Sequence, residues 1–349
     1  MNKQLSIVGL LTLFLVGTTA YSQKSKEKEI KLKEVVVIAT KFKLEKEKIG
    51  KVITKITQEE IQNNAGKTIF ELLNNVSGVE IKGINSNPGE IKGIYIRGGR
   101  SKQVLVLIDG IPVSDPTGVN QEYDLRLLSL NQIESIEILK GASSTLYGSG
   151  AATGVINIIL KKGNKKDVSA TYEVSLGTNN DANTKNLRLL DRNQNVSIHG
   201  SLKNFNYLAT FTISGVDGMS SAKSKTNKSF STDPFYNKSS LVKLGYRFSN
   251  QFELETFVNY DTFKYTYDAG AYSNSDINNG EDTQVRIGVK PSFKYNNGEA
   301  YLQASFNDVN RVLHTFNSYA NGVNKYDYTG KSINIDAVNR LTFSEGTYQ

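Results

Sequence analysis

Few residues in this sequence have the types and spacing that chemistry at a site requires. The glycines of the segment YGSGAATG, Gly148, Gly150 and Gly154, lie between apolar runs, as in a loop that holds phosphate. The third glycine stands one residue too late for the dinucleotide fingerprint, and no acidic residue follows at the expected distance. We therefore interpret these glycines as residues that permit tight turns against neighbouring structure.

The two histidines do not indicate a catalytic site. His199 and His314 are far apart in the sequence, and no serine or carboxylate pattern around them would form a triad or a metal site. The sequence contains no cysteine, which excludes disulfides, thiolate metal sites and a lipid anchor on cysteine. We therefore expect neither an enzyme nor a bound cofactor.

The first 22 residues have the pattern of a cleaved secretory signal. Lys3 precedes an apolar run from Leu5 to Gly17, and small residues surround a cleavage site after Ser22. The alternative is a membrane anchor, but a spanning helix needs about 20 apolar residues and this run is shorter. The sequence thus predicts an exported protein that begins with the charged stretch QKSKEKEIKLK, which is typical of a disordered tether.

Composition changes near residue 166. Most tyrosines and phenylalanines follow this point, whereas the basic excess precedes it. The formal net charge is +8, but basic and aromatic residues are not interleaved as nucleic-acid binding would require. We interpret the excess as a solvated surface and expect two regions of different architecture.

The first region has a mixed α/β pattern. Thr57 with Glu60, and Thr68 with Glu71, have the spacing of capping boxes that begin two short helices, the second running to Val76. The segment VLVLIDGIPV predicts a hairpin, because Asp-Gly favours the positive φ angles of a tight turn. Short apolar runs predict strands at 52–56, 94–96, 104–108, 133–139 and 155–160.

The second region alternates strictly between apolar and polar residues. Val242, Leu244 and Tyr246 would point to one side of a strand, with Lys243 and Gly245 on the other, and several later segments repeat this pattern. Connections alternate between short turns, such as Ser249-Asn250, and long polar segments, which we place at 214–240, 262–283 and 308–330. A soluble β-sandwich is the alternative, but this asymmetry of the connections favours an outer-membrane barrel.

Several motifs of the first region resemble one known family. The stretches NVSGVEIKG (75–83), IRGGRSKQVLVLIDGIPVSDP (96–116) and LNQIESIEILKGASSTLYGSGAATGVINIILKK (130–162) are similar to the plug of TonB-dependent outer-membrane receptors. Because several motifs occur in the same order and spacing, the resemblance is specific over about residues 45–165. Over the predicted barrel, the resemblance is limited to the alternation of residues within the strands and the spacing of the strands.

The resemblance implies an α+β plug domain followed by a partial antiparallel transmembrane β-barrel. The expected organisation is a signal peptide (1–22), a flexible tether (23–44), the plug (45–165) and the N-terminal part of the barrel (166–349). Receptors of this class have barrels of about 22 strands, whereas about eight fit here, so we expect this chain to be a fragment of a longer receptor. The location implied is the outer membrane, in contact with its lipid.

The same resemblance implies an energy-transducing partner. A short extended segment before the plug reaches the inner-membrane protein TonB, which works with its energising complex. The expected TonB-binding residues are Glu34, Val35, Val36, Val37, Ile38, Ala39 and Thr40. Their β-branched side chains favour an extended strand that TonB can pair with through main-chain hydrogen bonds. The alternative is that Val35–Ile38 is simply the first strand of the plug.

Ligand contacts are expected on plug loops opposite the tether. The residues we predict are Asn85, Ser86, Asn87, Arg100, Ser101, Asp115, Asn120 and Tyr123. Polar loop sequence of this kind also occurs on any exposed surface. Arg97 matches a family arginine that faces barrel carboxylates, for which Glu253 and Glu255 are candidates.

Cobalamin is the first expected ligand, because the plug most resembles that of cobalamin receptors. Such receptors can order their outer loops with calcium, for which Asp268, Asp276, Glu281 and Asp282 are weak candidates here. A ferric siderophore is the alternative, since its negative charge would suit the basic residues Lys223, Lys225 and Lys228. A surface-binding protein that does not transport would lack the TonB-binding segment.

Overall fold

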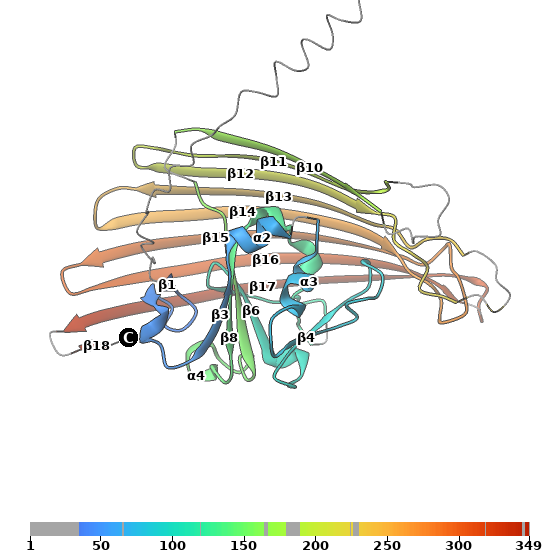
Figure 1. The fold of residues 1–349 in the computed structure, drawn as a ribbon, viewed down its shortest axis with the longest axis horizontal. Helices are drawn as coiled ribbons and strands as arrows, with labels where there is room; N and C mark the ends of the chain where they lie inside the picture. The colour runs from blue at the N-terminus through green and yellow to red at the C-terminus, as the bar shows by residue number, and fades with distance from the viewer. Residues whose placement is uncertain are drawn as a thin grey trace, which may run out of the picture. The chain divides into compact units, whose positions relative to one another are not determined.

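The computed structural model describes residues 35–64, 66–118, 120–163, 167–178, 189–223, 225, 230–317, 319–343 and 346–348. The predicted signal peptide and the tether as far as Glu34 lie outside the described residues. Within the described part, short helices and strands come first, and a large sheet of long strands follows (Figure 1). No helix in this part is both long and apolar enough to cross a membrane.

A five-stranded sheet forms the centre of the first region. Its strand order is β3, β8, β9, β6, β7, and all pairs are antiparallel except β6 with β9. The strands are β3 (Val52–Ile56), β6 (Val104–Ile108), β7 (Ile111–Val113), β8 (Ile133–Lys140) and β9 (Gly154–Leu160). The predicted strands and the β6–β7 hairpin are confirmed, and Asp109 and Gly110 have the positive φ angles, 51° and 83°, that its turn needs.

Two short helices accompany this sheet, α2 (Gln58–Asn63) and α3 (Ile69–Asn74). Both predicted capping boxes are confirmed. In each, the threonine hydroxyl accepts from the backbone N–H three residues later, and the glutamate carboxylate accepts from the threonine N–H. Helix α3 ends at Asn74, before the predicted Val76.

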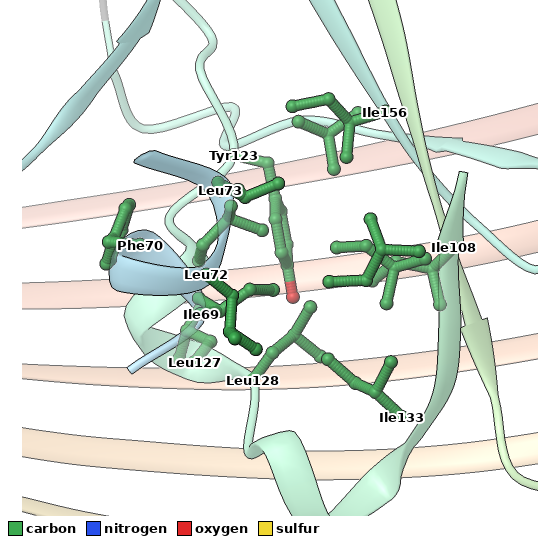
Figure 2. Packing of buried hydrophobic residues seen from close by; sticks show 14 of the residues in the cluster. Ile69, Phe70, Leu72, Leu73, Ile108, Tyr123, Leu127, Leu128, Ile133 and Ile156 are labelled. Carbon is green, nitrogen blue, oxygen red and sulfur yellow. The ribbon is translucent and has the colours of Figure 1, made fainter. Parts of the chain in front are cut away.

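Apolar side chains of α3 and the sheet form the main core. Leu73 and Ile156 are fully buried and Ile108 nearly so, and they lie around Tyr123, whose ring enters the same cluster (Figure 2). Burial of such side chains is the main stabilising contribution in a domain of this kind. The cluster continues into the large sheet through side chains such as Leu208 and Leu241.

Smaller elements complete the first region. A hairpin pairs β4 (Val79–Lys82) with β5 (Gly93–Ile96), and β1 (Val35–Val36) pairs with β2 (Leu44–Glu45). The remaining short helices are η1 (Lys46–Lys48), η2 (Ser101–Gln103), η3 (Leu125–Leu127), η4 (Leu130–Gln132) and α4 (Ser144–Tyr147).

The second region is one antiparallel sheet in which each strand pairs with the next. Eight long strands and one short strand are described. They are β10 (Ser169–Gly177), β11 (Asp191–Leu202), β12 (Phe205–Val216), β13 (Phe235–Arg247), β14 (Phe252–Thr266), β15 (Asn279–Tyr295), β16 (Gly298–Asn317), β17 (Gly322–Phe343) and β18 (Gly346–Tyr348). We call β10–β18 the wall.

The two faces of the wall differ in polarity, as the alternation predicted. On β13, Val242 and Leu244 are exposed, whereas Ser239 and Lys243 are buried against the first region. Other buried polar side chains on the inner face include Asn195, Thr212, Asn259, Asp261, Gln284, Arg286, Gln303 and Asn307. An apolar outer face and a polar inner face are the arrangement of a membrane barrel, not of a soluble sandwich.

The connections alternate between short and long, with one correction. Short turns join β11 to β12, β13 to β14 and β15 to β16, and longer connections occupy 178–190, 217–234 and 267–278. The predicted long loop at 308–330 is wrong, because β16 and β17 pair from Gly298↔Leu341 to Asn317↔Gly322. This segment contains many polar residues yet keeps its backbone ladder, so polarity alone does not indicate a loop.

Candidate functional site

The segment predicted to bind TonB packs against the first region. The side chains of Val36 and Ile38 are fully buried. They belong to a cluster with Ile53, Leu107, Leu139, Ala151 and Val155. The β-branched residues that suit an extended strand therefore also form a small apolar core with β3, β6, β8 and β9. Glu34 lies outside the described residues, so this description covers Val35 to Thr40.

Polar contacts occupy the main chain of this segment. The buried carboxylate of Glu137 accepts from the backbone N–H groups of Val37, at 3.0 Å, and Ile38, at 2.9 Å. The Tyr147 hydroxyl donates to the Ile38 carbonyl at 2.8 Å, and burial raises the pKa of Tyr147, which keeps this donor protonated. The backbone groups that strand pairing would use are thus engaged within the protein.

The two residues after this segment contact the wall. The Lys41 ammonium lies 2.6 Å from a carboxylate oxygen of Asp336, and the Tyr301 hydroxyl donates to the Lys41 carbonyl at 3.2 Å. The buried Phe42 ring contacts Tyr301 edge-on, and the Arg340 guanidinium lies over the Phe42 ring, 4.5 Å from its centre. Residues 41–42 therefore join the end of the segment to β16 and β17.

The first predicted ligand loop, 84–89, is held by the neighbouring Lys92. The Lys92 ammonium donates to the carbonyls of Gly83 and Asn87 and to the carbonyl and hydroxyl of Ser86. Burial lowers the pKa of Lys92. Among the predicted residues, Asn85 is exposed, whereas Asn87 is buried and donates to the Met219 carbonyl at 2.9 Å.

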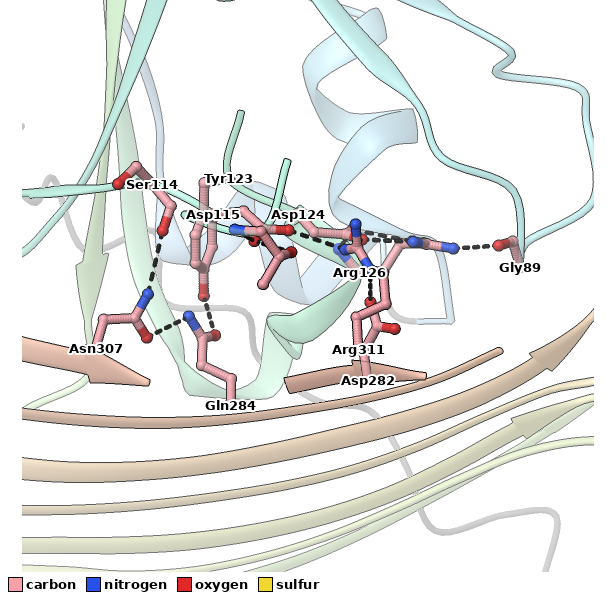
Figure 3. Close-up of polar contacts among 11 residues, drawn as sticks. Gly89, Ser114, Asp115, Tyr123, Asp124, Arg126, Asp282, Gln284, Asn307 and Arg311 are labelled. Atoms are coloured by element: carbon pink, nitrogen blue, oxygen red, sulfur yellow. Dashed lines mark hydrogen bonds and ion pairs between the residues drawn. The ribbon is translucent and has the colours of Figure 1, made fainter. Parts of the chain in front are cut away.

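The second loop, 114–123, is attached to the wall. The Asn307 amide donates to the Ser114 carbonyl at 3.1 Å, and the Tyr123 hydroxyl donates to Gln284 at 3.1 Å (Figure 3). Asp115 and Tyr123 are buried, whereas Asn120 is exposed. Burial raises the pKa of Tyr123.

The third loop meets the second. The Ser101 hydroxyl donates to the Glu122 carboxylate at 2.6 Å, and Arg100 is exposed beside it. The exposed members of the predicted ligand set are therefore Asn85, Arg100 and Asn120. Ligand contact by any member of the set remains a prediction.

A buried ionic network links these loops to the wall. Arg311 on β16 contacts Asp115 at 2.9 Å and Asp282 of β15 at 2.8 Å, and Asp124 lies 3.9 Å away (Figure 3). Asp124 pairs with Arg126, which donates to the Gly89 carbonyl. Burial opposes ionisation of Asp124, but Arg126 and its hydrogen bonds outweigh burial and lower the pKa of Asp124.

A cavity of about 1340 Å³ borders the first loop. Ile84, Asn85 and Ser86 line it on one side, and strands β10–β13 line it on the other through residues such as Asn195 and Asn237. The lining is mixed in polarity, and it includes the predicted ligand residues Asn85 and Ser86.

The weak calcium candidates are not gathered into one site. Asp282 pairs with Arg311, and Glu281 pairs with the exposed Lys264 at 2.8 Å. Asp276 accepts from Ser231, and Asp268 accepts from Ser220 and the Ala222 N–H. Within the described residues no group of three or more potential ligands could hold a metal ion.

Arg97 is exposed and is not brought to the predicted carboxylates. Glu255 pairs with Lys162 at 2.9 Å, and Glu253 lies 3.9 Å from Arg247. Among the described ion pairs none includes Arg97, so its contact with the barrel remains a prediction.

The glycines and histidines serve local structure. Gly148 follows α4 with a φ of 86°, and a Cβ on Gly154 would lie 2.6 Å from Ile96. Both positions thus require glycine for a turn or a close approach. His199 lies on β11 and His314 on β16, where its ring meets Asn279 at 3.1 Å.

Sequence reasoning missed Glu137, Lys92 and the two arginines of the buried ionic network, Arg126 and Arg311. A signal for the first was present, because Glu137 interrupts the apolar run of β8 between Ile136 and Ile138. A charged residue in a buried strand indicates a specific partner. That partner could not be identified, because it lies 100 residues away in the sequence.

The family model for the TonB-dependent Receptor Plug Domain matches residues 45–155. Residues 45–155 thus match the plug domain of TonB-dependent receptors, and the wall has the fold of part of their barrel. The family and the apolar outer face of the wall give the protein an outer-membrane location. The receptors and transporters that it matches are not enzymes.

Curated relatives are transporters or receptors for two kinds of nutrient. The Vitamin B12 transporter BtuB of Vibrio cholerae is 31% identical over 178 residues, covering 51% of this chain and 28% of the transporter. The Ferrienterobactin receptor of Escherichia coli K12 is 31% identical over 175 residues, covering 47% of this chain and 23% of the receptor. The chain thus matches about a quarter of the length of these relatives.

Solved structures share the fold. The ferric enterobactin receptor PfeA from Pseudomonas aeruginosa has a TM-score of 0.66 at 20% identity, covering 83% of this chain and 46% of that receptor. The siderophore receptor PirA from Acinetobacter baumannii has a TM-score of 0.67 at 19% identity, with coverages of 83% and 45%. At this identity the likeness concerns the fold alone.

Proposed function

We propose that the protein is a TonB-dependent receptor that takes up cobalamin across the outer membrane. The observation that carries the proposal is a plug domain against which the N-terminal segment 35–40 packs and whose first polar loop borders a cavity. A ferric siderophore is the second candidate ligand.

TonB is the proposed partner, and it would bind residues 34–40 by strand addition. In the described structure the N–H groups of Val37 and Ile38 already donate to Glu137, and Val36 is fully buried. Strand addition requires free main-chain groups, so the segment must leave Glu137 and the apolar cluster before it can pair with TonB.

Two observations support cobalamin as the first ligand. Several of the curated relatives that match the plug are named vitamin B12 transporters. In addition, the exposed residues Asn85 and Asn120 on two plug loops carry amide groups. Amides donate and accept hydrogen bonds, and they therefore complement a ligand whose periphery is itself rich in amides.

Basic residues near the third connection of the wall favour the siderophore. The Lys225 ammonium lies 4.6 Å from the centre of the Tyr272 ring, and both residues belong to connections on the same side of the wall. Lys223 lies two residues earlier, whereas Lys228 lies outside the described residues. A cation over an aromatic ring would suit an anionic aromatic ligand.

Equilibrium binding to the detergent-purified receptor tests the proposal, with cyanocobalamin and ferric enterobactin as probes. We expect cyanocobalamin to bind with little dependence on salt, because it carries little net charge. Binding of ferric enterobactin alone would replace the first candidate by the second, and Lys225→Gln should then weaken it. Binding of neither probe at micromolar concentrations would contradict both ligands.

A further inference from the structure

We propose that Arg311 and Arg126 are positioning residues that hold two plug loops, 84–89 and 114–123, at a fixed separation, and so set the affinity for a ligand that touches both. The inference rests on the proposed function in that these loops face the ligand. Neither arginine need contact it, because both side chains are largely buried.

Asp115 is the point at which the second loop is both folded and attached. Its backbone N–H donates to the Gln121 carbonyl, and its carbonyl accepts from the Gly118 N–H, which together close the loop. One carboxylate oxygen accepts from the N–H and hydroxyl of Thr117, and the other contacts Arg311 at 2.9 Å. The shape of the loop and its position on the wall therefore depend on the same side chain.

Arg126 attaches the first loop to the same network. Its guanidinium donates to the Gly89 carbonyl at the end of that loop and forms a fork with the Asp124 carboxylate. The guanidinium also lies over the rings of Phe263 and Tyr265 on β14, at 4.6 and 4.9 Å. These rings exclude water from the ion pair, and ion pairs are stronger away from water.

Arg311 connects the two attachments. Its guanidinium contacts Asp115 of the second loop and lies 3.9 Å from Asp124, the partner of Arg126. Asp282 on the neighbouring strand holds the same guanidinium at 2.8 Å, so the arginine is itself fixed to the wall. Removing one member of such a buried network leaves its partners as unpaired buried charges, which is strongly unfavourable.

Close backbone contacts make the two loops sensitive to this spacing. A Cβ on Gly330 of β17 would lie 2.8 Å from Pro116 in the second loop, and a Cβ on Gly89 would lie 2.8 Å from Tyr265. Both loops therefore lie directly against wall strands, with no room for adjustment. A ligand that contacts both would meet loops that are already in place, which lowers the entropic cost of binding.

The test measures the separation of the loops directly. Nitroxide labels at Asn85→Cys and Asn120→Cys report the distance by pulsed electron resonance, and no native cysteine interferes. We expect one narrow distance distribution in the otherwise unchanged receptor and a broad one in Arg311→Gln. Lys264→Gln is the matched control, because it also removes one positive charge but from an exposed ion pair with Glu281.

Affinity gives the second readout. We use whichever of cyanocobalamin and ferric enterobactin binds the unchanged receptor. Arg311→Gln should bind it roughly tenfold more weakly, because its loops must be ordered during binding, and Lys264→Gln should bind it normally. If Arg311→Gln does not fold, Gly330→Ala displaces Pro116 without removing a charge and should also broaden the distribution.

The outcomes separate the two proposals. A narrow distribution in both Arg311→Gln and Gly330→Ala, or a broad distribution with unchanged affinity, overturns the positioning role. If the unchanged receptor binds neither probe yet its loop distance broadens in Arg311→Gln, the proposed ligands fail, whereas the positioning of the loops by Arg311 is supported.

Discussion

The plug and the wall place apolar and polar residues in opposite ways. In the plug, apolar side chains such as Leu73 and Ile138 are buried and polar side chains lie mostly outside. In the wall, apolar side chains such as Ile333 and Leu302 are exposed, whereas polar side chains such as Gln303 and Asn307 are buried against the plug. The plug has the polar surface and apolar core of a water-soluble domain. The wall has an apolar outer face that suits lipid and a polar inner face that contacts the plug.

This difference teaches that the inner face of the wall adds many polar contacts to the plug, beside the apolar cluster that continues from the plug into the wall. The plug has an apolar core and capped helices of its own. The wall has continuous backbone ladders, which satisfy its N–H and C=O groups within a bilayer. Each region therefore has stabilising interactions of its own besides its contacts with the other region.

The largest expected effect comes from the plug core. Leu73→Ala should lower the free energy of unfolding by about 2–5 kcal/mol, because Leu73 is fully buried and the substitution leaves a cavity. Leu302→Ala on the outer face of the wall should have a much smaller effect, because lipid tails fill the space. Urea unfolding in lipid vesicles measures both, and equal losses would contradict the contrast between the regions.

Substitution by a charged residue should distinguish a position that is exposed to lipid from one that is exposed to water. Ile335 and Val52 are exposed by 70% and 55%, on the wall and the plug respectively. Ile335→Arg should destabilise the protein by about 2–4 kcal/mol if the position lies at the middle of the bilayer. Val52→Arg should change stability by less than about 0.5 kcal/mol in water. Similar effects of the two substitutions on insertion and unfolding would remove the assignment of the outer face to lipid.

An intermediate effect is expected where the N-terminal segment packs on the plug. Glu137→Ala should weaken this packing by about 1–3 kcal/mol, because two buried backbone N–H groups lose their acceptor. Faster maleimide labelling of Ala39→Cys measures the release, and Glu80→Ala, which changes an exposed glutamate of β4, is the control. An unchanged labelling rate would show that the apolar cluster alone holds the segment.

The smallest effects concern local interactions at the surface. Thr68→Ala removes the capping box of α3 and should lower the free energy of unfolding by about 1 kcal/mol. Lys264→Gln removes an exposed ion pair of the wall and should lower the free energy of unfolding by at most about 1 kcal/mol. The two are compared by urea unfolding in one vesicle preparation, and a larger loss for Lys264→Gln would reverse the expected order.

Much of the fold could be predicted because its causes are local in the sequence. The capping boxes depend on residues three apart, and the Asp109–Gly110 turn depends on two adjacent residues. The alternation around Val242 indicated which face of β13 is apolar. The predicted loop at 308–330 failed because local polarity does not report whether a neighbouring strand continues the ladder.

The site was less predictable, because its contacts join distant parts of the chain. The sequence determined the residue types: a β-branched segment at 35–38, polar loops at 84–89 and 114–123, and charged residues placed within apolar runs. Only the tertiary structure decided the partners, since Glu137 reaches Val37 and Ile38, and Arg311 reaches Asp115 from 196 residues away. A buried charge requires a partner, but which partner it finds depends on how the plug and the wall pack together.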